Sequence, residues 1–136
     1  MGLAERRAAN EFETTVLPGF RARIDEAAGF AVTLEINWDQ LSPAGEARLF
    51  PECWPQVYFE PLTEGLKIVG RDKLGKEALA AGLKKVVIQN TFANYNSDNW
   101  AKFVDGVLIL DHDPLTNAVY VNPRTEGLVK ALEAGI

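Results

Sequence analysis

The fold class is decided by residues 78–115, which read ALAAGLKKVVIQNTFANYNSDNWAKFVDGVLILDHDPL. This stretch predicts the end of a helix, an apolar strand over residues 85–90, a polar loop over 91–100, and then a hairpin. The hairpin is indicated by Asp105-Gly106 between two apolar runs, because both central residues of a type I′ turn must adopt positive φ. Pro114 cannot donate a hydrogen bond to a ladder, so the last strand ends before it. We therefore predict an antiparallel meander over residues 85–112.

The N-terminal third of the sequence predicts a helix followed by a strand. Apolar residues recur every four positions from Phe12 to Ala28, which predicts a helix over residues 3–28. Pro18-Gly19 interrupts this pattern, so we expect a kink or a break near Leu17. Residues 31–38 alternate between apolar and polar side chains, which predicts a half-buried strand.

The central and C-terminal segments predict further helices. Ser42-Pro43 resembles a helix start, and helical spacing over residues 62–69 favours a helix there, whereas the residues from Tyr58 onward also permit a strand. Asp72 is placed to cap another helix, and the last helix is expected over residues 124–134. The prediction is a single α+β domain over residues 1–136: an antiparallel sheet of about four to six strands with N-terminal, central and C-terminal helices packed on it.

Composition indicates an ordinary globular protein. The chain has 136 residues, of which 47% are hydrophobic and 24% are charged. No apolar run approaches the roughly 20 residues of a membrane-spanning helix, and we predict no membrane association. The N-terminus lacks the pattern of a secretory signal. The single cysteine, Cys53, allows no internal disulfide and is typical of a reducing compartment. We therefore expect a cytoplasmic location.

The net charge of −5 is unevenly distributed along the chain. Residues 30–70 carry a charge of −4, since six acids stand against two bases; the acids are Glu35, Asp39, Glu46, Glu52, Glu60 and Glu64, and the bases are Arg48 and Lys67. This acidic block disfavours direct nucleic-acid binding, which needs clustered Lys and Arg. It would suit a basic partner, although an acidic surface that only serves solubility is the commoner explanation.

The leading hypothesis is a non-enzymatic acidic protein-binding module, and within that class a bacterial immunity or antitoxin-type protein that binds a basic partner. The loop over residues 91–100 interleaves polar and aromatic side chains, a composition common in recognition surfaces. In the alternative, Phe92 and Trp100 fold inward and the asparagines form local turns. The predicted contact residues are Glu35, Asp39, Glu60, Glu64, Tyr95 and Trp100.

A second hypothesis is a small ligand-binding or hydrolytic domain with a cleft around Asp111, His112 and Asp113, joined by Cys53. On a strand the two aspartates point to one side and the histidine to the other, so a shared metal would require a bend. We predict no metal site, because a zinc site would need further ligands and only Cys53 or distant carboxylates are available. We predict no cofactor, and phosphate-loop and dinucleotide fingerprints are absent. A third hypothesis is a homo-oligomeric structural protein that associates through the meander edge or the helix faces. The sequence does not give the number of subunits.

Overall fold

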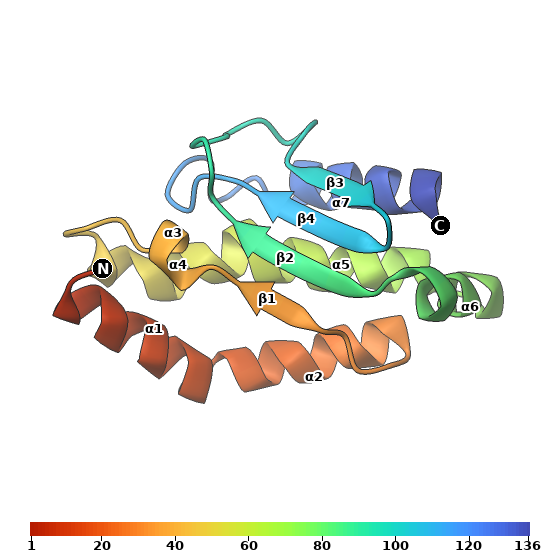
Figure 1. Ribbon diagram of the computed structural model, residues 1–136, viewed down its shortest axis with the longest axis horizontal. Helices are drawn as coiled ribbons and strands as arrows, with labels where there is room; N and C mark the ends of the chain where they lie inside the picture. Colours follow the sequence, from red (N-terminus) through yellow and green to blue (C-terminus); the bar gives the residue numbers. More distant parts are fainter.

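The computed structural model describes residues 1–136, and Figure 1 shows the arrangement of its elements. In chain order the elements are α1 (Leu3–Thr15), α2 (Leu17–Ala28), β1 (Leu34–Ile36), α3 (Trp38–Leu41), the 3₁₀ turn η1 (Ala47–Leu49), α4 (Phe50–Trp54), the π turn η2 (Pro55–Phe59), α5 (Glu60–Val69), α6 (Lys73–Gly82), β2 (Lys85–Gln89), β3 (Ala101–Val104), β4 (Val107–Asp111) and α7 (Val121–Gly135). The predicted α+β class is confirmed.

The four strands form one mixed sheet in the order β1-β2-β4-β3. Strands β1, β2 and β4 are parallel, and only β3 runs antiparallel to its neighbour β4. The predicted antiparallel sheet and meander are therefore wrong, because β4 lies between β2 and β3. The sequence VLIL in β4 is apolar at every position, which suits a central strand, whereas β3 alternates and keeps Lys102 exposed at the edge.

The predicted hairpin at Asp105-Gly106 is confirmed. Asp105 has φ 51° and Gly106 has φ 82°, as a type I′ turn requires. The turn joins β3 to β4 in the register that pairs Val104 with Val107. The local turn signal thus determines this strand pair, but it carries no information about which side of the pair β2 joins.

The N-terminal helix breaks as predicted. α1 ends at Thr15, α2 begins at Leu17 with Pro18 in its first turn, and Gly29 ends α2 with φ 89°. The predicted strand after it is present but spans only three residues.

The central segment is helical throughout from Phe50 to Val69. Pro55 has no N–H for the helix ladder, and the turn that it opens widens so that the N–H of Glu60 bonds to the carbonyl of Pro55. The strand considered from Tyr58 is therefore absent. The short helix expected from Ser42 to about Phe50 is also wrong, because that span contains only the 3₁₀ turn η1. The Asp72 cap is confirmed, because its Oδ1 accepts a hydrogen bond from the Gly75 N–H at 2.8 Å.

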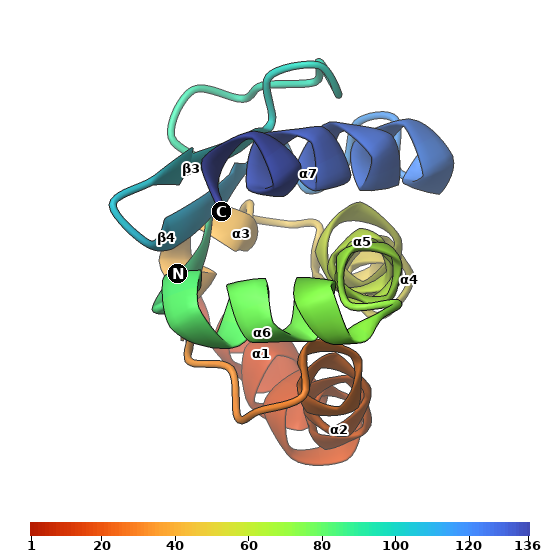
Figure 2. The same ribbon diagram turned by 90° about the vertical axis from the view of Figure 1, so that its right-hand side faces the viewer.

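The helices cover one face of the sheet and leave the other face open (Figures 1 and 2). Val86 and Ile88 of β2 and Leu108 and Leu110 of β4 point toward α5 and α7 and have no exposed surface. They belong to one continuous core cluster of 26 buried residues. None of the helices is both long and apolar enough to span a bilayer.

Candidate functional site at the carboxyl ends of the parallel strands

The three parallel strands end at the same edge of the sheet, where their arrowheads point in one direction in Figure 1. β1 leads into α3, β2 into the loop 90–100, and β4 into the loop 112–120. In open sheets with parallel strands, ligands and partners bind at the carboxyl ends of the strands. We refer to this region as the carboxyl edge.

Asp111 ties the start of the loop 90–100 to the end of β4. Its carboxylate accepts hydrogen bonds from the Thr91 N–H at 2.9 Å, from the Thr91 hydroxyl, and from Gln89 Nε2 at 3.1 Å. The side chain is buried on the open face of the sheet. Because most of its acceptor capacity is used by these three donors, Asp111 acts as an anchor for the loop.

Asn94 organises the same loop from within. Its buried side-chain amide donates to Asn99 Oδ1 at 2.9 Å and to the carbonyl of Asp111 at 3.2 Å. The backbone carbonyl of Asn94 accepts a hydrogen bond from the Asp113 N–H at 2.7 Å. These bonds link the loop 90–100 to the loop 112–120, so the two loops form one connected unit.

Arg124 of α7 binds the loop 112–120 through its side chain. Its side chain has no exposed surface. The guanidinium donates to the carbonyl of Asn117 at 2.8 Å, of Ala118 at 2.6 Å, and of Gln56 at 3.1 Å. Burial lowers its pKa to about 10, against the opposing effect of Tyr58. The cation is paired with backbone carbonyls alone and thereby fixes the loop to η2.

His112 lies in the core beneath the loops. The Tyr58 hydroxyl donates to the His112 carbonyl at 2.6 Å, and His112 Nδ1 lies 2.7 Å from the carbonyl of Asp113. A carbonyl only accepts, so Nδ1 carries the hydrogen and Nε2 is the bare nitrogen. Nε2 is buried without a partner. Burial lowers the pKa of His112 and raises that of Tyr58.

Large apolar side chains are exposed on the outer side of the same two loops. Tyr95 is 67% exposed, Val119 73% and Tyr120 53%. Asn117 Nδ2 donates to the carbonyl of Tyr95 at 3.3 Å, which joins the two loops next to these residues. We call Tyr95, Val119 and Tyr120 the loop patch. The hydrogen bonds below it hold the patch in place in the isolated protein.

The charge at the carboxyl edge is of one sign. Residues 37–41, 90–100 and 111–123 contain Asp39, Asp98, Asp111 and Asp113 and no Lys or Arg, which gives −4. α3 belongs to this edge, because Gln40 Oε1 accepts a hydrogen bond from the Asn90 N–H at 3.1 Å. Asp39 and Asp98 are exposed and Asp113 is half-buried. The two loops that carry the patch therefore contain Asp98 and Asp113 and no Lys or Arg, although the buried cation of Arg124 contacts the loop 112–120 and Lys130 lines a hollow with Asp98.

The structure brings only two of the six predicted contact residues to this edge. Asp39 and Tyr95 lie there and are exposed. Trp100 lies in the core, where its Nε1 donates to the Arg124 carbonyl at 2.8 Å and its ring meets that of His112 edge-on.

The other predicted acids lie elsewhere. Glu35 lies on the open face of the sheet and pairs with Lys85 at 3.2 Å. Glu60 and Glu64 lie on α5 beside Arg23, and Glu64 pairs with Lys67 at 3.3 Å.

The side chains of the second hypothesis point in different directions. Asp111 points to the open face and His112 to the core, as the strand alternation predicts. Cys53 lies half-buried in α4, and burial together with Glu52 raises its pKa. No three His, Cys, Asp or Glu side chains gather as a possible metal-binding group.

Sequence reasoning missed Val119, Tyr120 and Arg124. Residues 117–122 alternate like a strand but form a turn, in which the Tyr120 N–H donates to the Asn117 carbonyl at 3.0 Å. The nearby Pro123 was a usable signal for a turn before a helix. Nothing in the sequence distinguishes Arg124 from an exposed arginine of a first helical turn.

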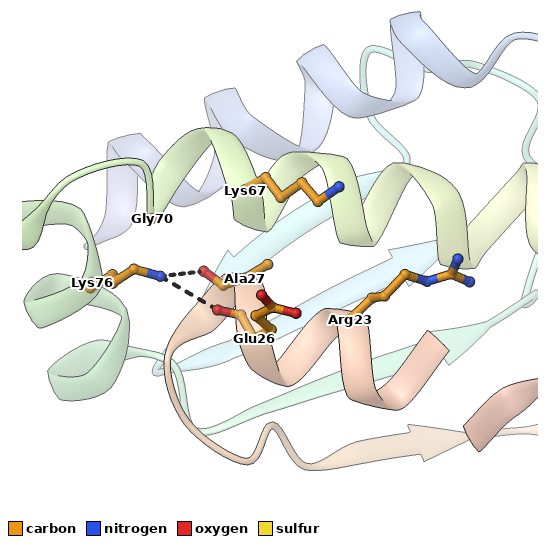
Figure 3. A pocket seen from close by; sticks show the side chains of 6 residues that line it. All are labelled: Arg23, Glu26, Ala27, Lys67, Gly70 and Lys76. Carbon is orange, nitrogen blue, oxygen red and sulfur yellow. Dashed lines mark hydrogen bonds between the residues drawn. The ribbon is translucent and has the colours of Figure 1, made fainter. Parts of the chain in front are cut away.

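Away from the carboxyl edge, a hollow of about 440 Å³ lies between α2, α5 and α6 (Figure 3). Its charged side chains are Arg23, Glu26, Lys67 and Lys76. Lys76 Nζ donates to the carbonyls of Ala27 at 3.2 Å and Glu26 at 3.5 Å, and so balances the negative end of the α2 dipole. Through these two hydrogen bonds Lys76 holds α6 against the C-terminal end of α2.

No known family model matches the chain, and it has no match among curated proteins or solved structures.

Proposed function

We propose that this protein is a non-enzymatic binding module for a basic protein partner, which it contacts through the loop patch at the carboxyl edge. The observation that carries the proposal is the exposure of Tyr95, Val119 and Tyr120 on two interlocked loops that contain Asp98 and Asp113 and no Lys or Arg. Exposed aromatic side chains on fixed backbone are typical of the residues that dominate binding energy.

The rigidity of the loops favours binding. Asn94, Asp111 and Arg124 fix the backbone on which the patch lies. Because the loops are ordered before contact, little conformational entropy is lost when a partner binds. The surrounding carboxylates attract a basic partner and accelerate the encounter, with an effect that salt weakens.

The hydrolytic alternative has less support. It requires an imidazole that substrate can reach, but His112 has no exposed surface. The neighbouring carboxylate of Asp111 is engaged by Thr91 and Gln89. A bacterial immunity or antitoxin-type protein, which covers the functional surface of a basic toxin, is the class of binding module that this arrangement suits best.

The test compares three tagged proteins as baits in lysate of the source organism: the wild type, the double variant Tyr95→Ala/Tyr120→Ala, and Leu74→Ala. Leu74 on α6 is 77% exposed and lies outside the carboxyl edge, so it is a matched control for loss of an exposed apolar side chain. We expect the wild type and Leu74→Ala to retain a basic protein that high salt releases, and the double variant to lose it. Equal retention by all three baits, or retention of acidic proteins only, would contradict the proposal.

A further inference from the structure

The outer face of the sheet is uncovered, although three of its four strands are parallel (Figure 1). Sheets built of parallel strands normally have both faces covered. The side chains on this face are not uniformly polar. The strand register places these residues on it: Glu35, Lys85, Val87, Gln89, Lys102, Val104, Val107, Ile109 and Asp111.

One row of residues crosses the open face from edge to edge. Glu35 of β1 is in register with Val87 of β2, Val87 with Ile109 of β4, and Ile109 with Lys102 of β3. The row thus has an acid at one end, two apolar residues in the middle and a base at the other end. Glu35 and Lys102 are both exposed.

This pattern is complementary to itself under a two-fold axis that runs parallel to the strands between β2 and β4. Such an axis turns a second copy face to face with the first and exchanges the two ends of the row. Glu35 of each copy then lies opposite Lys102 of the other, and Val87 lies opposite Ile109. An axis perpendicular to the strands would place Glu35 opposite Glu35 and is disfavoured by like charge.

The neighbouring rows agree with the same axis. Lys85 is in register with Val107, and Gln89 with Asp111. The same two-fold axis therefore places the aliphatic stem of Lys85 over Val107 of the other copy. It also places the amide of Gln89 near the Asp111 carboxylate of the other copy. Phe92, which is 59% exposed, extends the face at its carboxyl end, where it lines a hollow with Ile109 and Lys102.

We propose that the open face is covered by a second copy of this chain in a two-fold, face-to-face dimer. Facing sheets pack roughly 10 Å apart. The face of four short strands is small beside the roughly 800 Å² per partner of a standard interface, so the dimer is a weak one, with a dissociation constant in the micromolar range or above. This dimer does not depend on the proposed function, because the loop patch is not part of the face.

The test uses charge reversal in two separate variants, Glu35→Lys and Lys102→Glu. Each variant alone places like charges opposite each other at both ends of the row. An equimolar mixture of the two restores both opposite pairs in a heterodimer. Lys73→Glu is the control, because it reverses an exposed charge on α6 that is not part of the open face.

Sedimentation equilibrium from about 1 µM to 1 mM measures the association. We expect the wild type to shift from 15.0 kDa toward twice that mass, and each reversal variant to dimerise at least tenfold more weakly. The mixture should recover dimerisation, with the heterodimer identified by native mass spectrometry, and Lys73→Glu should resemble the wild type. A wild type that stays monomeric at 1 mM overturns the proposal, as does a mixture of folded variants that associates no better than either alone.

Discussion

Arg124 Nη2 lies 2.6 Å from the carbonyl oxygen of Ala118. The bond connects the buried base of α7 to the loop that carries Val119 and Tyr120. Because Arg124 also bonds to the carbonyls of Asn117 and Gln56, a single side chain holds the loop that carries two of the three loop-patch residues. The shape of the exposed surface thus depends on a residue that has no exposed surface itself.

Replacement of Arg124 by Met is expected to destabilise the protein by at least about 2 kcal/mol, because the carbonyls of Gln56 and Ala118 lose their donor and each costs about 1–3 kcal/mol, whereas the Asn117 carbonyl keeps the Tyr120 N–H. Arg124→Lys keeps the charge but cannot reproduce the planar fork of donors, so we expect a smaller loss than for Met. Urea denaturation measures both. A loss below 1 kcal/mol for Met would show that the loop does not depend on Arg124.

His112 should make stability depend on pH. Burial lowers its pKa below the ordinary value of 6.5, so between the folded-state pKa and about 6.5 the unfolded chain binds more protons than the folded one. The free energy of unfolding is therefore fully retained above about pH 7 and falls as pH drops through the folded-state pKa. Denaturation curves of the wild type and His112→Gln measure this effect. Parallel pH profiles for the two proteins would exclude it.

Tyr58→Phe removes the donor to the buried carbonyl of His112, which lies 2.6 Å from the hydroxyl. We expect a loss of about 1–3 kcal/mol, because that carbonyl is left unpaired in the core. The raised pKa of Tyr58, caused first by burial, also predicts that the wild type loses stability as pH rises above about 10 and that the Phe variant loses less. Thermal unfolding at pH 8 and pH 10.5 separates the two effects.

Gly127→Ala and Gly19→Ala should change stability in opposite directions. A Cβ at Gly127 would lie 2.4 Å from the carbonyl oxygen of Ser97, so alanine must push α7 and the loop 90–100 apart. A Cβ at Gly19 meets nothing within 4 Å and lies in α2. We expect Gly127→Ala to cost about 1–3 kcal/mol and Gly19→Ala to add up to about 1 kcal/mol. Chemical denaturation gives both signs, and a neutral Gly127→Ala would show that the close approach is relaxed in solution.

Local sequence signals predicted the elements that depend on local physics. Asp105-Gly106 specified a turn with positive φ, Pro18 and Gly29 marked helix boundaries, and Asp72 capped α6. Each of these residues acts on the backbone within a few positions of itself. Elements of this kind can be predicted from one sequence.

Strand order could not be predicted in the same way. The hairpin fixes β3 against β4, but the loop 90–100 is long enough to place β2 on either side of the pair. In the parallel pair that β2 forms with β4, Val86 and Ile88 lie in register with Leu108 and Leu110, and all four are buried on the core face. Only one of the three loop-patch residues was singled out from the sequence: Tyr95 stood out by composition, whereas Val119 and Tyr120 resembled a strand until the turn at Asn117 was known.

The central claim is that a basic partner contacts the loop patch, and site-specific photo-cross-linking tests it most directly. A photoreactive phenylalanine at position 95 is compared with one at position 74, which is equally apolar and more exposed in the wild type. The account predicts that, in lysate, position 95 cross-links to one basic protein in a salt-sensitive manner and position 74 does not. Cross-linking to the same protein from position 74 with equal yield, or no specific product at position 95, would contradict it.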